Sequence, residues 1–315
     1  MTSKIALILL LFATIVACNN NDDDYSTIDI EGIIFNGDIE CCTPIEAFKV
    51  DSFIKLQKIV PELTLSIDGE TDRYEIQAYT ATGTFQVGYN EIFFIAKKRS
   101  TGNFIKDFYI SNITPLMHMT EMDMYHSTPT SGVASNFDDK PIALQRSWVS
   151  FIMPSGNAGS WDLSYNANIL GYTNSLKNAQ LKDVASQPEG EKWVQSFKAN
   201  NKTYYISLIN TNLWQVGTNI ISAYVSVQSD DPTTLYKLAT ETFTIDIDPQ
   251  STNGTSANNK PLTPNANRLY SGSISLSSAG HWRIHLTVRD AEGNIVAGGD
   301  NLTDGHSSLY WDITL

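Results

Sequence analysis

Short runs in which β-branched and aromatic residues alternate with polar residues dominate the chain from about residue 72 onward. An alternation of period two is typical of strands that bury one face. Clear examples are residues 73–79, 91–96, 204–208 and 220–227. Residues 290–294 lie between two such runs and predict a hairpin loop. Helical periodicity is scarce, with one short helix predicted within 43–59, so the pattern predicts an all-β protein.

The strand pattern occurs twice along the chain. Tyr74 and Tyr204 are 130 residues apart, and Trp161 and Trp282 are 121 apart. The separations shrink steadily in between, as loops of slightly different length would produce. The matched positions are Tyr74 with Tyr204, Gly88 with Gly217, Asn90 with Asn219, His126 with Gln250, Arg146 with Arg268, Trp148 with Tyr270, and Trp161 with Trp282.

Each copy has the size and strand rhythm of an immunoglobulin-like sandwich. The sequence therefore predicts two tandem immunoglobulin-like β-sandwiches. The first spans 28–170 with an N-terminal extension, and the second spans 185–315, with the boundary in a polar stretch between them. The matched residues Trp161 and Trp282 are predicted to be core residues.

The start of the chain predicts a lipoprotein signal peptide over residues 1–17. Lys4 precedes an apolar run at 5–17, which is too short to span a bilayer as a helix. Small and aliphatic residues then lead directly to Cys18, as in a bacterial lipobox, so Cys18 is predicted to carry lipid. An ordinary signal peptide with a chance cysteine is the alternative.

Residues 18–27 are predicted to form an acidic tether, because NNNDDD at 19–24 is polar and lacks aromatic residues. The acidic run resembles the surface-export signal of Bacteroidota lipoproteins, which implies a lipid-anchored outer-membrane protein exposed at the cell surface. A plain solvated spacer is the alternative. The net charge of −13 argues against nucleic acid and anionic membrane surfaces as partners. Cys41 and Cys42 are adjacent and could be thiols, a strained disulfide or soft-metal ligands.

Methionine and histidine are concentrated in one segment. Of six methionines, Met1 is lost with the signal, four fall within eight residues, and Met153 is the remaining one. Thioether sulfur suits Cu(I), and imidazole suits Cu(I) and Cu(II). Unlike thiols, thioethers do not enter disulfide exchange outside the cell. The sequence predicts a copper site, with Met153 as an additional cap, whose ligands are Met117, His118, Met119, Met122, Met124 and His126.

The faces of this segment depend on its local structure. If 117–126 were one extended strand, one face would carry His118, Met122, Met124 and His126. The other face would carry Met117, Met119, Glu121 and Asp123. A bulge or a turn near Thr120 would help neighbouring side chains converge on one ion. A methionine-rich core strand is the alternative, although the second copy has ordinary strand residues at 244–250.

The first copy resembles the YtkA-like domain family of small immunoglobulin-like envelope domains over about 75–165. The residues that carry the resemblance are Gly88, Asn90 and Ile92, the segments 115–119 and 126–129, and the strand leading to Trp161. The resemblance implies a β-sandwich whose binding residues are Met117, His118, Met119 and His126. The motif contains no cysteine, so ligation would depend on thioether and imidazole.

These observations predict a surface lipoprotein that binds copper as a chaperone, scavenger or buffer and is not an enzyme. The spacing of His118, Glu121 and His126 is not that of a zinc protease, and His281 and His285 are interpreted as surface or edge residues. The alternative is a non-enzymatic adhesion or interaction module that presents loops to a protein or glycan partner. In that case Trp148, Trp193 and Trp214 would be exposed. Any envelope protein partner stays unidentified.

Overall fold

The computed structural model describes residues 40–41, 63–66, 73–80, 83–136, 144–157, 159–181, 183–209, 214–300 and 305–315. All secondary-structure elements within these residues are β-strands, so the predicted all-β class is confirmed. Within the same residues, no helix is long and apolar enough to cross a membrane. The predicted signal peptide, Cys18, the acidic tether, the predicted helix and Cys42 lie outside them.

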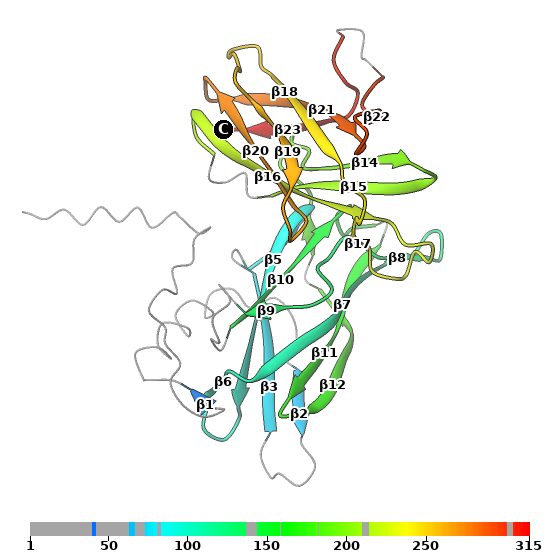
Figure 1. Cartoon of the computed structure of the whole chain (residues 1–315). Coiled ribbons are helices and arrows are strands. Elements are labelled where there is room, and N and C mark those ends of the chain that lie inside the picture. Colours follow the sequence, from blue (N-terminus) through cyan, green and yellow to red (C-terminus); the bar gives the residue numbers. More distant parts are fainter. Residues whose placement is uncertain are drawn as a thin grey trace, which may run out of the picture.

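The first sandwich consists of two main sheets (Figure 1). The larger sheet has the order β1-β6-β5-β10-β9, and β3 also pairs with β5 and β2. Its strands are β1 (Glu40–Cys41), β2 (Leu63–Ser66), β3 (Arg73–Tyr79), β5 (Gly88–Lys98), β6 (Phe104–Ile105), β9 (Ser135–Asn136) and β10 (Gln145–Phe151). The facing sheet has the order β12-β11-β7-β8 and is formed by β7 (Phe108–Met119), β8 (Met124–His126), β11 (Ser160–Ile169) and β12 (Tyr172–Gln180).

The core of the first sandwich follows from the alternation along its strands. In β11, Trp161, Leu163 and Tyr165 are buried and the residues between them are not. Their rings meet aromatic residues of the other sheet: Tyr165 lies 5.2 Å from Phe94, and Trp161 lies 5.0 Å from Phe151, in edge-to-face geometry. These contacts hold the two sheets face to face.

The second sandwich is one hydrogen-bonded path that folds over its own core, in the order β14-β15-β16-β20-β19-β18-β21-β22. Its layers are joined by β19, which pairs with both β20 and β18. The strands are β14 (Val194–Ala199), β15 (Lys202–Ile209), β16 (Gly217–Val227), β17 (Lys237–Leu238), β18 (Thr244–Gln250), β19 (Lys260–Pro264), β20 (Leu269–Leu276), β21 (His281–Arg289), β22 (Ile295–Ala297) and β23 (Tyr310–Thr314). The hairpin predicted at 290–294 joins β21 to β22 and is confirmed.

Two separate hydrophobic cores mark the tandem arrangement. The first core includes Val184, and the second begins with Trp193. Strand β12 belongs to the first sandwich, and the short β13 (Val184–Ala185) pairs in parallel with β4 (Phe85–Gln86) of the same sandwich. The first sandwich therefore continues past the predicted end at residue 170.

The repeat is visible in matching hydrogen bonds. Asn90 Nδ2 donates to the carbonyls of Gln86 and Gly88 at 2.7 Å each, and Asn90 Oδ1 accepts from the Gln86 amide. Asn219 makes the same three bonds to Gln215 and Gly217. Both glycines have positive φ angles, which explains glycine at this position in each copy. Trp161 and Trp282 are fully buried, so their prediction as core residues is confirmed.

The predicted register of the repeat is wrong in one strand pair. Trp148 lies opposite Glu91, whereas Tyr270 lies opposite Ala223. Phe151 and Leu276 are the equivalent residues, because each lies opposite the corresponding glycine, Gly88 or Gly217. The matched strands are correct, but short aromatic matches cannot fix register to a single residue.

The two sandwiches meet through a compact joint. Trp148 of β10 stacks on Tyr224 of β16 with ring centroids 4.5 Å apart. Ser150 Oγ donates to Ser207 Oγ at 2.7 Å in a buried position, and the Ser127 amide donates to the Pro232 carbonyl at 2.6 Å. Trp148 is buried in this joint and Trp193 in the second core, so the exposure that the interaction-module alternative expected for them is wrong. Trp214 is partly buried against the second core.

Candidate metal centre

The methionine-rich segment is a hairpin and not one extended strand. Strand β7 ends at Met119, a turn occupies 120–123, and β8 begins at Met124. Asp123 adopts a φ of 47°, a left-handed conformation that Asp tolerates because its short side chain can bond locally. The faces predicted for an extended strand are therefore wrong, whereas the turn considered near Thr120 is present.

The hairpin register sets which side chains share a face. Met117 lies opposite His126, and Met119 lies opposite Met124. Directly opposite residues of an antiparallel pair project from the same face. Met117 is fully buried and lies next to Trp161 of β11, so this shared face is the one that points toward the core.

Met153 approaches the same face from the end of β10. Its Sδ lies 3.2 Å from Nε2 of His126, and its carbonyl accepts a hydrogen bond from Nε1 of Trp161 at 3.1 Å. The Trp161 ring also meets the His126 ring edge to face at 5.2 Å. Met153, predicted only as a cap, therefore lies against the one imidazole of the face. The residues Met117, Met119, Met124, His126 and Met153 are called the Met/His cluster below.

The hydrogen bond on the far side of the His126 ring determines its tautomer. Nδ1 lies 3.0 Å from the carbonyl oxygen of Ser127, which can only accept. In the neutral ring, Nδ1 therefore carries the proton and Nε2 presents a lone pair to the sulfur of Met153. In that neutral tautomer, no proton lies between Nε2 and the sulfur. A carbonyl that holds the proton of the second ring nitrogen is also the usual support of a metal-bound imidazole.

The spacing of the pair is close to what one ion requires. Metal–nitrogen and metal–sulfur bonds of about 2.0 and 2.3 Å at a tetrahedral angle separate the two ligand atoms by about 3.5 Å. The observed 3.2 Å is shorter by a few tenths of an ångström. A small rotation of the unbranched Met153 side chain would open that distance.

The remaining predicted ligands lie away from this face. His118 points to the outer side of the sheet, where its ring stacks on Tyr125 at 4.4 Å and Nε2 lies 3.4 Å from Asp123 Oδ1. Burial raises the pKa of the neighbouring Asp162, while the proximity of His118 lowers it in part. Met122 is in the turn and is 55% exposed. The six predicted ligands thus separate into an inner set and two outer residues, His118 and Met122.

Harder ligands do not gather in the part of the chain that the structure describes. There, no group of three or more His, Cys, Asp or Glu side chains could hold a metal ion. A metal at the Met/His cluster would depend on thioether sulfur. Met124, which is 52% exposed, lies where the cluster opens to solvent.

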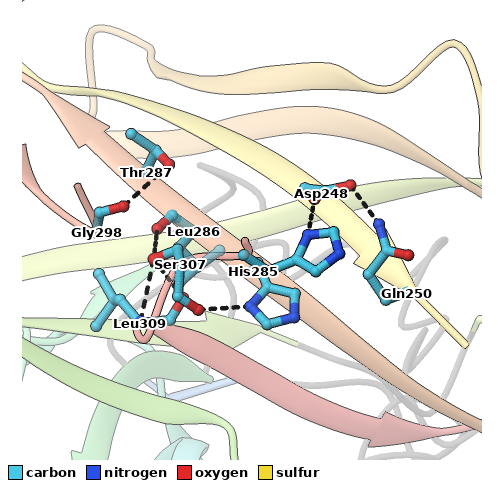
Figure 2. Close-up of polar contacts among 9 residues, drawn as sticks. Asp248, Gln250, His285, Leu286, Thr287, Gly298, Ser307 and Leu309 are labelled. Carbon is cyan, nitrogen blue, oxygen red and sulfur yellow. Dashed lines mark hydrogen bonds and ion pairs between the residues drawn. The ribbon is translucent and has the colours of Figure 1, made fainter. Parts of the chain in front are cut away.

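A histidine cluster that the sequence pattern does not predict lies in the second sandwich (Figure 2). His285 is only 3% exposed, so its interpretation as a surface or edge residue is wrong. Its Nδ1 lies 2.6 Å from the Ser307 carbonyl, and its ring stacks on His306 at 4.8 Å. His306 Nδ1 in turn lies 2.7 Å from Asp248 Oδ2. His306 and Ser307, which are distant in sequence, cover the outer face of β21 at His285. The alternation of residues along β21 alone cannot predict that this face is covered.

Comparison with known proteins adds little to this description. No profile of a known protein family matches the chain, and no curated protein matches it. Among solved structures, the chain is similar to FdeC, an Escherichia coli adhesin, with 11% sequence identity and a TM-score of 0.22. The match covers 76% of this chain and 63% of that chain, which is less than two thirds of its length. The chain is a tandem immunoglobulin-like β-sandwich protein, and a fold of this kind does not by itself define a function.

Proposed function

We propose that the protein binds Cu(I) at the Met/His cluster. The observation that carries the proposal is the pairing of His126 Nε2 with Met153 Sδ at 3.2 Å, with the proton of the ring held on the opposite nitrogen. Met117 and Met119 lie on the same face beside this pair, and Met124 lies at its outer end.

The chemistry of the ligands favours a soft monovalent ion. Thioethers and a neutral imidazole are uncharged, so they compensate a single positive charge better than a double one in a partly buried site. Zn²⁺ sites usually include thiolate, several imidazoles or carboxylate, and the inner face of the hairpin offers one imidazole. The net charge of −13 also raises the local concentration of cations around the chain.

The proposed role is that of a copper chaperone, scavenger or buffer without catalytic turnover. In this proposal Cys18 carries the lipid, and the protein is anchored to the outer membrane with the sandwiches at the cell surface. The lipobox-like residues before Cys18 and the acidic run after it support this location. Copper is the proposed cofactor, and the lipid is the only proposed membrane contact.

The test is an anaerobic Cu(I) titration of the mature chain, made soluble by Cys18→Ser, against a competing chromophoric chelator. The inner variant combines Met119→Leu, His126→Gln and Met153→Leu, since leucine preserves the volume of methionine. The matched control combines His118→Gln and Met122→Leu from the outer side of the same hairpin. We expect one Cu(I) per chain, an affinity loss of about 100-fold or more in the inner variant, and no loss in the control.

Two results would contradict the proposal. Equal, weak affinity in all three proteins would leave the methionines as packing residues of the sandwich. A loss of affinity confined to the control variant would place the ion on the outer face with His118. A circular dichroism spectrum of each variant shows whether the sandwich is intact.

A further inference from the structure

A solvent-open cleft of about 360 Å³ lies where the two sandwiches meet. The first sandwich contributes residues of β5, β10 and the segment 131–135, and the second contributes residues of β15, β16 and β20. A volume of this size is at the lower end of the range for small-molecule sites, which often lie between domains. The cleft is separate from the Met/His cluster, with which it shares no residue.

An ion pair between Glu91 and Arg146 lies in the cleft. Glu91 Oε1 accepts a hydrogen bond from the Tyr89 hydroxyl at 3.4 Å and lies 3.6 Å from the Arg146 guanidinium. Burial raises the pKa of Glu91, although Arg146 and the Tyr89 hydroxyl both oppose the rise. The carboxylate has acceptor positions beyond these two contacts, and one carboxylate beside one guanidinium leaves no net charge.

Hydroxyl groups and aromatic rings make up much of the remaining wall. Ser131 Oγ is fully used, because it donates to the Val133 carbonyl and accepts from the Trp148 amide and from Ser147 Oγ at 2.6 Å. Ser147 Oγ therefore keeps acceptor positions, and Ser222 Oγ, which lies 3.2 Å from Ser271 Oγ, keeps at least one further position for a hydrogen bond. Trp148 and Tyr224, stacked on one another, add carbon surface beside these polar groups.

We propose that this cleft binds one unit of a neutral saccharide. Its hydroxyls would donate to Glu91, accept from the Arg146 guanidinium, and form hydrogen bonds with Ser147 Oγ and Ser222 Oγ. Its C–H groups would pack against the half-buried ring of Tyr224, which Trp148 supports from the first sandwich.

Other ligand classes fit the cleft less well. A cation would meet the guanidinium beside Glu91, and an anion would meet the carboxylate beside Arg146, at 3.6 Å separation in both cases. An apolar ligand would remove water from the ion pair and the hydroxyls without replacing its hydrogen bonds. A compact, uncharged molecule with many hydroxyls satisfies all of these groups at once.

The test is a ligand-observed NMR titration of the mature Cys18→Ser chain with glucose, galactose, mannose and N-acetylglucosamine, and with glucuronate as the charged comparison, each up to about 10 mM. The Glu91→Gln variant removes the charged acceptor at nearly constant shape. The matched control is Glu241→Gln, which breaks an ion pair with Lys202 that does not line the cleft.

We expect saturable binding of at least one neutral sugar, and a weakening of tenfold or more in Glu91→Gln but not in Glu241→Gln. A deoxy analogue of the bound sugar should also bind more weakly, because its missing hydroxyl leaves a polar group of the cleft unpaired. Absence of binding by every neutral sugar would overturn the proposal. So would preference for glucuronate, or binding that both variants leave unchanged. None of these outcomes depends on copper binding.

Discussion

At the scale of single residues, the two sandwiches share one hydrogen-bonding pattern at the start of equivalent strands, β5 and β16. Asn90 and Asn219 each close a small loop by three hydrogen bonds to backbone groups. The surroundings differ, because Asn90 is buried whereas the loop of Asn219 is exposed to solvent. The free energy of these bonds should therefore differ between the copies.

Replacing each asparagine by alanine tests this difference. Asn90→Ala removes the partner of the buried Gly88 carbonyl and of the half-buried backbone groups of Gln86, at a cost of about 2–3 kcal/mol of unfolding free energy. Asn219→Ala should cost about 1 kcal/mol, because water can replace the lost bonds. Urea denaturation of both variants measures the two costs. Equal losses would show that burial at Asn90 does not matter.

Glu91 gives the chain a pH dependence that can be isolated by one substitution. Burial raises its pKa above the ordinary 4.5, so ionisation costs more in the folded chain than in the unfolded chain. This loss of folding free energy is absent below the pKa of Glu91 in the unfolded chain. It grows as the pH rises toward the raised pKa of the folded chain and is complete above that pKa.

Glu91→Gln should therefore stabilise the fold relative to the native chain at about pH 7 and lose that advantage toward about pH 4. Chemical denaturation of both proteins across this range measures the difference. A difference that does not change with pH would contradict a raised pKa. If the variant were destabilised only at neutral pH, the attraction to Arg146 would outweigh desolvation.

At the scale of elements, the β7–β8 hairpin shows which features of the candidate site the sequence predicts and which it does not. The concentration of methionine and histidine and the strand pattern were evident, but the shared face was not. In a continuous strand, Met119 and Met124 would lie on opposite faces, because they are separated by an odd number of residues. The turn at 120–123 reverses the chain and brings them opposite one another. The length of the turn decides which residues of the two strands share a face, and the alternation within each strand does not give that length.

Gly159 fixes the position of this hairpin. A Cβ at Gly159 would lie 2.2 Å from the His118 carbonyl and 3.1 Å from the Met119 Cα, which are backbone atoms of β7. A Cβ at Gly156 would have no heavy atom within 4 Å, apart from its chain neighbours, although the two glycines bond to each other. The two positions form a matched pair for substitution.

Gly159→Ala should push the end of β7 away from β11, at a cost of about 1–3 kcal/mol. It should also lower Cu(I) affinity, because Met117 and Met119 move with the strand. Gly156→Ala should leave both properties close to those of the native chain. Thermal unfolding and the chelator competition assay measure them. Native Cu(I) affinity in Gly159→Ala would contradict dependence of the cluster on the close approach of the strands.

At the scale of the whole molecule, hydrogen bonds between the sandwiches are made close to both His126 and Met153 of the Met/His cluster. The Ser127 amide, which follows His126 directly, donates to Pro232 of the second sandwich. Ser150, three residues before Met153, bonds to Ser207. The sequence predicted two domains but not this joint, because the side chains that form it lie on outer strand faces. Only the alternative of an interaction module assigned a position to Trp148, and it placed this residue on an exposed loop.

Tyr224→Ala should uncouple the sandwiches, because it removes the ring that stacks on Trp148. We expect the single cooperative unfolding transition of a coupled pair to separate into two, with weaker Cu(I) binding in the first sandwich. Tyr172→Ala, at a position 46% exposed on β12, is the control and should change neither. Differential scanning calorimetry distinguishes the outcomes, and one unchanged transition in Tyr224→Ala would contradict coupling through this contact.

The position of β19 between β18 and β20 affects how readily a protease can attack the second sandwich. Strand β19 pairs with β20 along its length and with β18 at Leu262, so a protease cannot bind this part of the strand in extended form unless these pairs open first. Cleavage in this part of the second sandwich should therefore require opening of the sheet. In the first sandwich, β8 ends its sheet, and among the described strands it pairs with β7 alone. Limited proteolysis should reach that edge first.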